Sequence, residues 1–518
     1  MTYRQLEHEV DRLAHGLLRL GFVKGDRLGV WLPNCSQYLV TQLAAAKLGV
    51  ILANINPAYR LAEAEYALRL VGMKGIIIQP SLRTTNYAEM LATMLPELRE
   101  ADSHPTKRIQ SQRLPELRYV INIGAKRLPG VLQYDEDVLG DKHQKPPHVP
   151  WRLHQDDDIN IQFTSGTTGS PKGVILTHTN ILNNGFFVGE RLRLTSHDRV
   201  CVPVPLYHCF GLVMGNIASF THGAALIYPT EVFDPEAVLK TVEAEKCTVL
   251  HGVPTMFITE LNHANFAKYD LSTLRTGIMA GSVCPLETMK EVISRMHLRE
   301  VTICYGMTET SPVSFQSHTD DPLNLRVETV GRVHPHLHCK VVDEQGNTVP
   351  VGVSGELLTK GYSVMRGYWG DPAKTDEVLT WDGWMHTGDL ATIDENGYCR
   401  IVGRIKDLII RGGENISPRE LEDILFEHPA VQSPSIIGVP DEFYGEQVCA
   451  WIILKDGHES TKKLEDDLRQ YLRDRVAHYK VPKYILFKKD FPMTASGKIQ
   501  KFIMTNMTTK ELGLKGKK

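Results

Sequence analysis

Apolar residues in the first twenty positions recur every three or four residues, which is the spacing of an amphipathic helix. Thr2 and Gln5 stand three positions apart at the start of this pattern, and a Thr followed by a Gln at this distance is a capping box. The sequence therefore predicts a helix that begins after Thr2. Its apolar face consists of Leu6, Val10, Leu13, Leu17 and Leu20.

Short apolar runs then alternate with helical patterns. Residues 27–32 and 49–55 have the composition of buried strands, and residues 36–48 between them have the pattern of a helix. Residues 249–257 indicate a strand, a turn and the start of a helix, and residues 276–282 a strand that ends in a glycine turn. Because such alternation is typical of α/β folds, we expect mixed or parallel sheets flanked by helices in a large domain of several subdomains.

The last hundred or so residues repeat this alternation on a smaller scale. Helices are expected at residues 418–427 and 461–475, and strands at residues 431–439 and 448–454. We therefore predict a second, small α+β domain at the C-terminal end of the chain.

Composition and charge narrow the possible functions. A chain of 518 residues must divide into more than one domain, and 42% hydrophobic with 23% charged residues is ordinary for a globular enzyme. A formal net charge of -3, with no basic stripe, gives no reason to expect a nucleic-acid partner. Nine scattered cysteines without a Cys-x-x-Cys pair indicate neither disulfides nor a zinc site, and a reducing compartment fits them. No apolar run is long enough for a membrane span.

One polar stretch stands between two apolar runs, residues 159–163 and 174–176, and is rich in glycines and hydroxyls with one lysine. Glycines let a backbone approach a polyphosphate, while amides, hydroxyls and an ammonium supply donors and positive charge. The stretch is not a Walker loop, because proline and glycine stand where that loop requires glycine and a hydroxyl. We predict a phosphate-binding loop between two strands, rather than a solvated turn, made of Thr164, Ser165, Gly166, Thr167, Thr168, Gly169, Ser170, Pro171, Lys172 and Gly173.

Further polar motifs each have an ordinary explanation when taken alone. His208 among aromatic residues is typical of a core histidine, Asp389 of a turn, and Lys498 of a solvated surface. Together with the phosphate loop, these motifs resemble in order and spacing the adenylate-forming superfamily, which contains acyl-CoA synthetases, luciferases and peptide-synthetase adenylation domains. The resemblance spans essentially the whole chain and is strongest to the medium-chain acyl-CoA synthetases.

The resemblance implies a role for each matching residue. In such enzymes Lys498 aligns the carboxylate with the α-phosphate, Thr308 contacts that phosphate, and Glu309 holds Mg²⁺ through the phosphates. His208 borders the acyl group, in the region of Tyr207, Met256, Phe257 and Gly281, and the absence of an aspartate at Phe210 argues against an amino-acid substrate. The residues that would contact adenine or ribose are Gly281, Ser282, Tyr305, Asp389 and Arg404. Met307 departs mildly from the common threonine.

The resemblance also implies two domains that move. The N-terminal AMP-binding domain would cover residues 1–403 and a mobile catalytic domain residues 404–518. Lys406 and Asp407 would form the hinge between them. Gly412 and Gly413, next to this hinge, would lie near the pantetheine arm of coenzyme A, where glycines allow close approach.

The activity implied is that of an AMP-forming acid–thiol ligase. ATP and a fatty acid, by resemblance of medium chain length, would give acyl-AMP and pyrophosphate, and coenzyme A would then give acyl-CoA and AMP, with Mg²⁺ required. Another adenylate-forming ligase with a different acceptor is one alternative. A non-catalytic nucleotide-binding protein is another, although Glu309, Asp389 and Lys498 argue against it.

Relatives extend further upstream than this sequence, so we expect an N-terminal segment, including a strand, to be missing. A chain without that strand would expose a sheet edge, which makes a poorly folded or inactive product a third possibility. The resemblance implies the mitochondrial matrix as the location, although no targeting peptide is present in the first helix.

Overall fold

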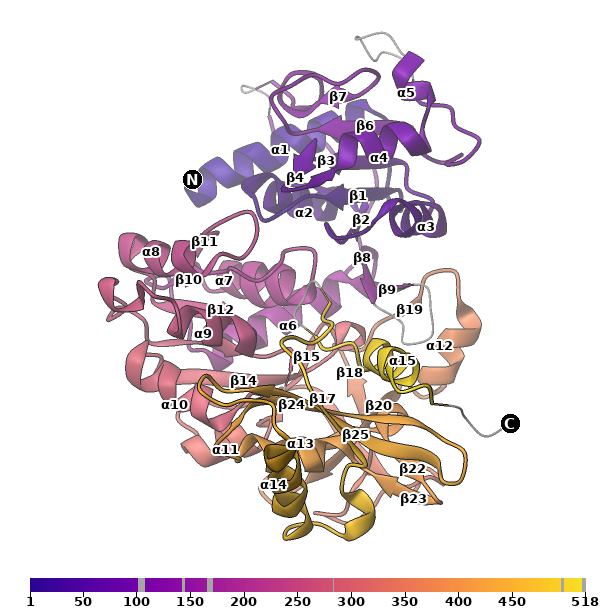
Figure 1. Cartoon of the computed structure of the whole chain (residues 1–518). Coiled ribbons are helices and arrows are strands. Elements are labelled where there is room, and N and C mark those ends of the chain that lie inside the picture. The colour runs from indigo at the N-terminus through magenta and orange to yellow at the C-terminus, as the bar shows by residue number, and fades with distance from the viewer. Residues whose placement is uncertain (101–107, 142–144, 165–170, 283, 495–497, 515–518) are drawn as a thin grey trace.

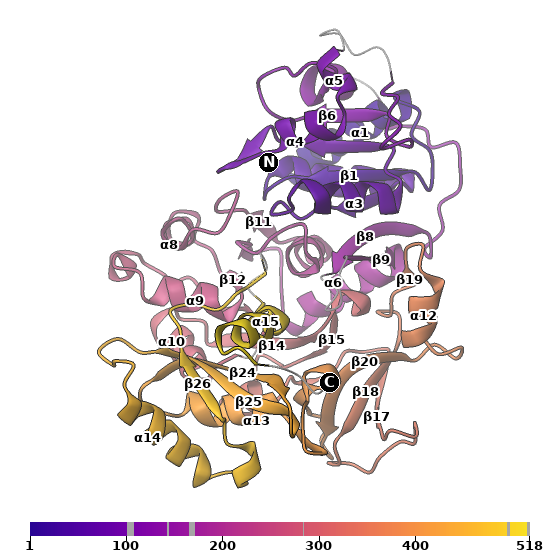
Figure 2. The ribbon, with the colours of Figure 1, turned by 45° about the vertical axis from the view of Figure 1, so that its right-hand side comes forward.

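A computed structural model of the protein describes residues 1–100, 108–141, 145–164, 171–282, 284–494 and 498–514. The first sheet lies with the N-terminal helices at one end of the molecule, the second sheet lies in the middle, and the third and fourth sheets share the opposite end (Figure 1). The view turned by 45° shows the same order, with β12 and β14 between these two ends (Figure 2). The expected α/β fold is confirmed.

The first sheet has the strand order β19-β9-β8-β2-β1-β3-β6-β7. Its strands from β8 to β7 run parallel, whereas β9 and β19 are antiparallel additions at one edge. The strands are β1 (Arg27–Trp31), β2 (Ile51–Asn54), β3 (Gly75–Ile78), β6 (Tyr119–Asn122), β7 (Leu132–Gln133), β8 (Asp158–Thr164), β9 (Lys172–Thr177) and β19 (Gly367–Tyr368).

The second sheet repeats this plan with the order β11-β10-β12-β13-β14-β15-β16. Strands β11 to β14 are parallel, and β15 and β16 are antiparallel additions at the edge. The strands are β10 (Arg199–Cys201), β11 (Ala225–Ile227), β12 (Val249–Gly252), β13 (Thr276–Met279), β14 (Glu300–Gly306), β15 (Val313–Gln316) and β16 (Arg332–Val333).

Two smaller sheets follow. The third is antiparallel and consists of β17 (Leu337–Val342), β18 (Gly355–Gly361), β20 (Met385–Ile393) and β21 (Cys399–Arg404). The fourth belongs to the C-terminal region and consists of β22 (Ile409–Arg411), β23 (Glu414–Ile416), β24 (Val431–Asp441), β25 (Gly445–Leu454) and β26 (Tyr484–Phe487). A small hairpin of β4 (Ser81–Leu82) and β5 (Thr85–Asn86) stands apart from them.

Helices cover the sheets. The N-terminal ones are α1 (Tyr3–Arg19), α2 (Ser36–Leu48), α3 (Leu61–Val71), α4 (Tyr87–Met94), α5 (Glu97–Glu100) and α6 (His178–Arg191). The central ones are α7 (Ala218–Thr221), α8 (Pro235–Glu245), α9 (Pro254–Leu261), α10 (Leu286–Arg295), α11 (Leu323–Glu328) and α12 (Pro372–Val378). The C-terminal ones are α13 (Pro418–Phe426), α14 (Lys462–Arg473) and α15 (Lys501–Glu511). No helix in these described stretches has the length and apolarity of a membrane span.

Short helical turns complete the chain: η1 (Tyr134–Val138), η2 (Phe210–Ile217), η3 (Phe266–Lys268), η4 (Thr308–Thr310), η5 (Ile405–Asp407) and η6 (His478–Lys480).

The predicted first helix is present with its cap. Thr2 accepts the amide hydrogen of Gln5, and the Gln5 side chain accepts the amide hydrogen of Thr2. Leu13 and Leu17 are fully buried in the largest core cluster, which α1 shares with α2 and strands of the first two sheets. The apolar stripe therefore packs as the sequence indicates.

The C-terminal region has its own core, made of apolar residues from β22 to β26 and from α13 and α14. The third sheet ends at Arg404, and the fourth begins at Ile409, with η5 between them. The boundary that we predict at residue 403 falls at the end of that third sheet and stays a prediction. All nine cysteines are free, as the sequence indicates.

Candidate functional site

The phosphate loop joins two antiparallel strands, as predicted. Thr164 at the end of β8 pairs with Lys172 at the start of β9, so the two residues face each other where the hairpin opens. The six loop residues between them that the sequence singles out, Ser165 to Ser170, lie outside the described residues. Lys172 places its Nζ atom 4.8 Å from the centre of the Tyr368 ring in the neighbouring strand β19.

The acidic motif follows β14 in a single turn, η4. The ladder between β14 and β15 shifts register at Tyr305 and Gly306, and this bulge turns the chain out of the sheet. A Cβ atom on Gly306 would lie 1.8 Å from the Pro312 carbonyl oxygen, so only glycine fits there. Thr308 is buried, and Glu309 is half-buried. The bulge therefore presents Thr308 and Glu309 beyond the carboxyl end of β14 in the second sheet.

Met307 takes part in this turn through its backbone. Its amide N–H donates to the Thr310 hydroxyl oxygen at 3.0 Å, and its carbonyl accepts the Thr310 amide hydrogen at 2.8 Å. The turn itself is therefore held without a hydroxyl at position 307, which makes the departure from the common threonine compatible with its shape.

Two residues in and next to β19 of the first sheet form hydrogen bonds to Glu309. The Tyr368 hydroxyl donates to Glu309 Oε1 at 2.9 Å, and the Met365 amide donates to the Glu309 carbonyl oxygen at 2.9 Å. Within the described parts of the chain, no group of three or more His, Cys, Asp or Glu side chains surrounds a possible metal position. A single carboxylate matches a Mg²⁺ ion that takes its other ligands from phosphates and water.

Asp389 on β20 is 2% exposed and lies between two partners. The Tyr305 hydroxyl donates to Asp389 Oδ2 at 2.6 Å, and Arg404 Nε forms an ion pair with Asp389 Oδ1 at 2.9 Å. Burial, and then the charge of Asp389, raise the pKa of Tyr305, which keeps its hydroxyl a donor. The carboxylate that the sequence assigns to ribose therefore lies beside both the predicted adenine-contacting tyrosine and the arginine that precedes the hinge.

His208 lies before η2 and accepts the Phe210 amide hydrogen at Nδ1, at 3.1 Å. Burial, and then the charge of Lys498, lower the pKa of His208 to about 3. The imidazole is therefore neutral at physiological pH. The adjacent Cys209 is buried and donates its thiol hydrogen to Gln162 Oε1 on β8, with Sγ and Oε1 3.0 Å apart.

Lys498 belongs to the C-terminal region, but its charge acts on His208 and is influenced by Glu309 and Asp389. Burial, and then Arg404, lower its pKa, while Glu309 and Asp389 act in the opposite direction. The residue is nevertheless exposed to solvent. The structure thus brings Lys498 together with His208, Glu309 and Asp389, which come from distant parts of the sequence.

The predicted hinge and coenzyme A residues lie beyond this cluster. Lys406 and Asp407 form η5, where burial, and then Arg404, lower the pKa of Lys406. Gly412 and Gly413 make the turn of the β22–β23 hairpin with φ of 62° and 90°. Because a two-residue hairpin turn of this kind favours glycine, the hairpin alone accounts for both, and their role toward coenzyme A stays a prediction.

Gly281 and Ser282 follow β13 and are exposed, with Gly281 at φ 96°. They lie beside the end of β14, since the two strands are parallel neighbours. The residues expected around the acyl chain separate: Tyr207 and Met256 pack against the largest core cluster, whereas Phe257 is fully buried in another. Phe257 therefore lies with the helices that cover the opposite face of the second sheet.

Sequence reasoning missed Tyr368, which contacts both Glu309 and Lys172. It also missed Asn184 of α6, which is fully buried and donates to the Val313 carbonyl oxygen at 2.8 Å, next to η4. Neither residue belongs to a glycine-rich or charged motif, and both act through partners far away in sequence. Only the tertiary contacts in the structure identify these two residues.

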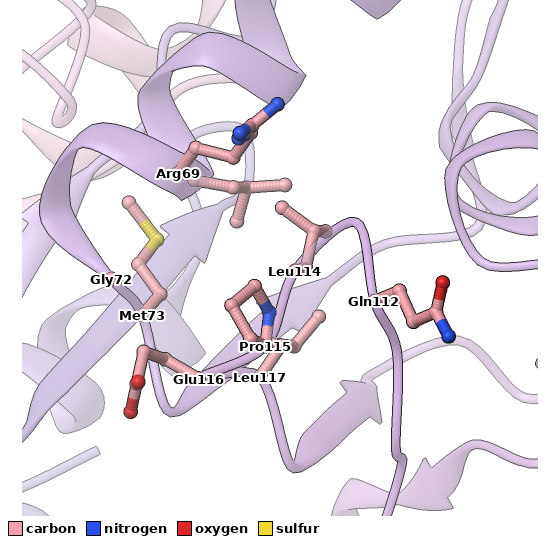
Figure 3. Close-up of a pocket in the computed structure, with 9 residues that line it drawn as sticks. Arg69, Gly72, Met73, Gln112, Leu114, Pro115, Glu116 and Leu117 are labelled. Carbon is pink, nitrogen blue, oxygen red and sulfur yellow. The ribbon is translucent and has the colours of Figure 1, made fainter.

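A separate cavity of about 230 Å³ lies at the end of α3, beside residues 112–117 (Figure 3). Met73, Leu114 and Pro115 point toward one another there, whereas Gln112 and Glu116 point away. No residue that the sequence predicts for the site is among those that line it. The residues that we predict for the site therefore lie outside this cavity.

Comparisons with known proteins agree with this arrangement. The family model for AMP-binding enzymes matches residues 1–369, and the model for the C-terminal domain of AMP-binding enzymes matches residues 420–498. YngI of Bacillus subtilis (strain 168), named provisionally as an acyl-CoA synthetase, is 48% identical over 99% of this chain and 93% of its own length. The mitochondrial medium-chain acyl-CoA ligase ACSF2 of Rattus norvegicus is 45% identical, over 99% of this chain and 84% of its own.

A solved structure has the same fold. The crystal structure of the anthranilate CoA ligase AuaEII in complex with anthranoyl-AMP superposes with a TM-score of 0.86 at 26% identity, covering 99% of this chain and 93% of that one. The two family models match the regions that hold the phosphate hairpin and Lys498. The chain therefore belongs to the family of AMP-binding, adenylate-forming enzymes.

Proposed function

We propose that this protein is an AMP-forming acyl-CoA ligase that acts on fatty acids of medium chain length. The observation that carries the proposal is the meeting of Lys498 from the C-terminal region with Glu309, Asp389 and His208. Attack of a carboxylate on the α-phosphate of ATP requires positive charge between the two anions and residues that hold the nucleotide. Lys498 can supply the charge, Glu309 can hold Mg²⁺, and Asp389 can bind the ribose.

The first half-reaction joins two anions. A fatty acid is already ionised at neutral pH, with a reference pKa of about 4.3, so no general base is needed. The carboxylate oxygen attacks the α-phosphorus and pyrophosphate leaves, giving acyl-AMP. Catalysis then depends on alignment and on cancelling charge. Lys498 would lie between carboxylate and α-phosphate, and Thr164 and Lys172 would hold the departing pyrophosphate.

The nucleotide would be held by side chains already in place. Asp389 would accept the ribose hydroxyls, which suits an acceptor-only carboxylate, and Tyr305 would pack on adenine. Thr308 would donate to the α-phosphate. Glu309 would hold Mg²⁺, which neutralises phosphate charge when it is bound.

The second half-reaction uses coenzyme A at the same carbonyl carbon. The thiol, with a reference pKa of about 8.5, is partly ionised at neutral pH; the thiolate displaces AMP from acyl-AMP and forms the thioester. Lys498 must withdraw for the thiol to approach, so we propose two orientations of the C-terminal region. Lys406 and Asp407 would absorb the change, and Gly412 and Gly413 would then approach the pantetheine arm.

The substrate class is supported by the site and by relatives. His208 is neutral, and Phe210 stands two residues after it, where an aspartate would hold the ammonium of an amino acid, so this position favours a fatty acid over an amino acid. ACSF2 of several vertebrates is named as a medium-chain acyl-CoA ligase at 43–45% identity. The names of those relatives also support a mitochondrial location, while YngI comes from a bacterium. Fractionation of source cells, followed by immunoblotting, tests that location.

The decisive experiment measures pyrophosphate release from ATP and Mg²⁺ across straight-chain acids from acetate to palmitate, with and without coenzyme A. We expect release to peak at intermediate chain lengths and to turn over repeatedly only with coenzyme A. Repeated turnover without coenzyme A would indicate a different acceptor. No release with any acid, from protein shown to be folded by circular dichroism, would contradict the ligase and favour a non-catalytic nucleotide-binding protein.

A further inference from the structure

Residues 365–369, which contain strand β19, connect β9 of the first sheet to the turn η4 that carries Glu309. On one side, the Trp369 amide donates to the Gly173 carbonyl oxygen at 2.7 Å, and the Arg366 amide to the Ile175 carbonyl oxygen at 3.1 Å. On the other side, the Met365 amide donates to the Glu309 carbonyl oxygen at 2.9 Å. Residues 365–369 therefore form hydrogen bonds both to β9, in the hairpin of the predicted phosphate-binding loop, and to Glu309 in η4.

The side chain at the middle of this bridge is Tyr368, which is 8% exposed. Its hydroxyl donates to Glu309 Oε1 at 2.9 Å, and its ring lies 4.8 Å from Lys172 Nζ. Its amide also donates to the Thr375 hydroxyl oxygen at 2.9 Å, which ties the backbone of β19 to α12. One buried ring thus contacts a carboxylate through its edge and a cation through its face.

Each contact restricts a group that otherwise has several rotamers. A hydroxyl bound to Oε1 fixes the plane of the Glu309 carboxylate, because a hydrogen bond to a charged acceptor is short and directional. A cation over an aromatic face is attracted by the ring quadrupole, which holds the flexible lysine on one side.

We propose that Tyr368 is a positioning residue that sets the carboxylate of Glu309 and the ammonium of Lys172 at a fixed spacing for the metal-bound polyphosphate. This inference rests on the proposed function, because it assumes that ATP and Mg²⁺ are bound at this site. Tyr368 itself touches neither reacting atom. It acts through the two charged residues, Lys172 on β9 of the first sheet and Glu309 in η4 after β14 of the second.

Two substitutions separate the two contacts. Tyr368→Phe removes the hydroxyl and keeps the ring, so it tests the hydrogen bond to Glu309. Tyr368→Leu removes both contacts. The matched control is Tyr362→Phe, because the Tyr362 hydroxyl is buried and has no hydrogen-bond partner among the described residues. It removes the same atom from a nearby tyrosine without breaking a contact.

The readout is calorimetric binding of ATP as a function of Mg²⁺ concentration, without acid or coenzyme A. For Tyr368→Phe we expect the Mg²⁺ concentration at half-maximal binding to rise about tenfold, as for loss of a hydrogen bond to a charged group. For Tyr368→Leu we expect a further weakening of about threefold even at saturating Mg²⁺. Tyr362→Phe should match the unmodified protein.

A double substitution distinguishes a loss of positioning from a simple loss of stability. In Glu309→Gln, the further change Tyr368→Phe should leave the Mg²⁺ requirement unaltered, because the carboxylate that the hydroxyl orients is already gone. An unchanged Mg²⁺ requirement in Tyr368→Phe, with only a lower Tm, would overturn the proposal and make Tyr368 a packing residue. Since these measurements need no acyl transfer, they stay decisive if the ligase assay fails.

Discussion

Two regions of the molecule supply the site, and they hold its residues in different ways. Glu309 and Lys172 are fixed by contacts within the first two sheets, through β19 and Tyr368. Asp389 shares its carboxylate between Tyr305 and Arg404, and Arg404 stands at the end of β21, directly before η5. Among the described residues, Glu309 and Lys172 are therefore held by contacts with one tyrosine, whereas Lys498 is supplied by the C-terminal region, which we propose takes two orientations.

The largest expected effect comes from removing the residue that arrives from the C-terminal region. Lys498→Ala should lower acyl-AMP formation by about a hundredfold or more, comparable to the loss of an oxyanion-hole donor of about 3 kcal/mol. Thioester formation from added acyl-AMP should change little, because the proposed mechanism has Lys498 withdraw before this step. Quenched-flow measurement of each half-reaction checks this. Equal losses in both would mean that Lys498 does not leave the site between them.

The next effect concerns the hinge. Lys406→Pro fixes φ at residue 406 and should trap one orientation, so one half-reaction should fall roughly tenfold or more while the other is spared. The same pair of half-reaction assays applies. Ile410→Ala, at an exposed position three residues past η5, serves as a control for substitution near the hinge. Equal loss in both half-reactions would contradict a pivot at Lys406.

A smaller effect is expected at the ion pair between Asp389 and Arg404. Arg404→Gln removes the cation but keeps a donor, and it should weaken ATP binding a fewfold while speeding proteolysis near residues 405–411. The physical reason is that this pair joins β20 to the last residue of β21, directly before η5, so losing it loosens the strand end that leads into the predicted hinge. Limited proteolysis with mass spectrometry checks the result. Unchanged cleavage would show that the ion pair does not hold the hinge.

The smallest effect is a pH dependence. Burial, and then Arg404, lower the pKa of Lys498, so this ammonium loses its proton at lower pH than a free lysine does. The rate of acyl-AMP formation should therefore fall a fewfold on the alkaline side before free lysine titrates. In Lys498→Arg, which keeps its charge, that decline should vanish from whatever rate remains. His208, with its pKa lowered to about 3, should add no titration near neutral pH.

Local patterns were enough to predict many elements. Helix α2 has the predicted bounds, because Gly49 in the left-handed region at φ 67° ends it. The phosphate loop lies between two strands, and α1 has its capping box, since each depends on neighbouring residues. The sheet order and the two-residue strand β19 could not be predicted, because they depend on pairing between distant segments.

The site residues likewise include some that the sequence predicts and some that it does not. Glu309, Asp389 and Lys498 carry motifs that can be recognised, and the structure brings them together. Tyr368 and Asn184 carry none, because a tyrosine or asparagine becomes important only through the partner that folding gives it. The π-helical form of η2 has no recognisable sequence signal either. Within it, a Cβ atom on Gly211 would lie 2.4 Å from the Pro205 carbonyl oxygen, so only glycine fits there.

The position of β19 also bears on the order in which the chain folds during synthesis. Tyr368 pairs with Val174, so the edge of the first sheet stays open until the ribosome has made the whole second sheet. Long-range pairing of this kind is slow, and an open edge invites association with other chains. The nascent chain therefore has a period in which β9 has no outer neighbour, and a chaperone that binds extended segments would be most useful to it then.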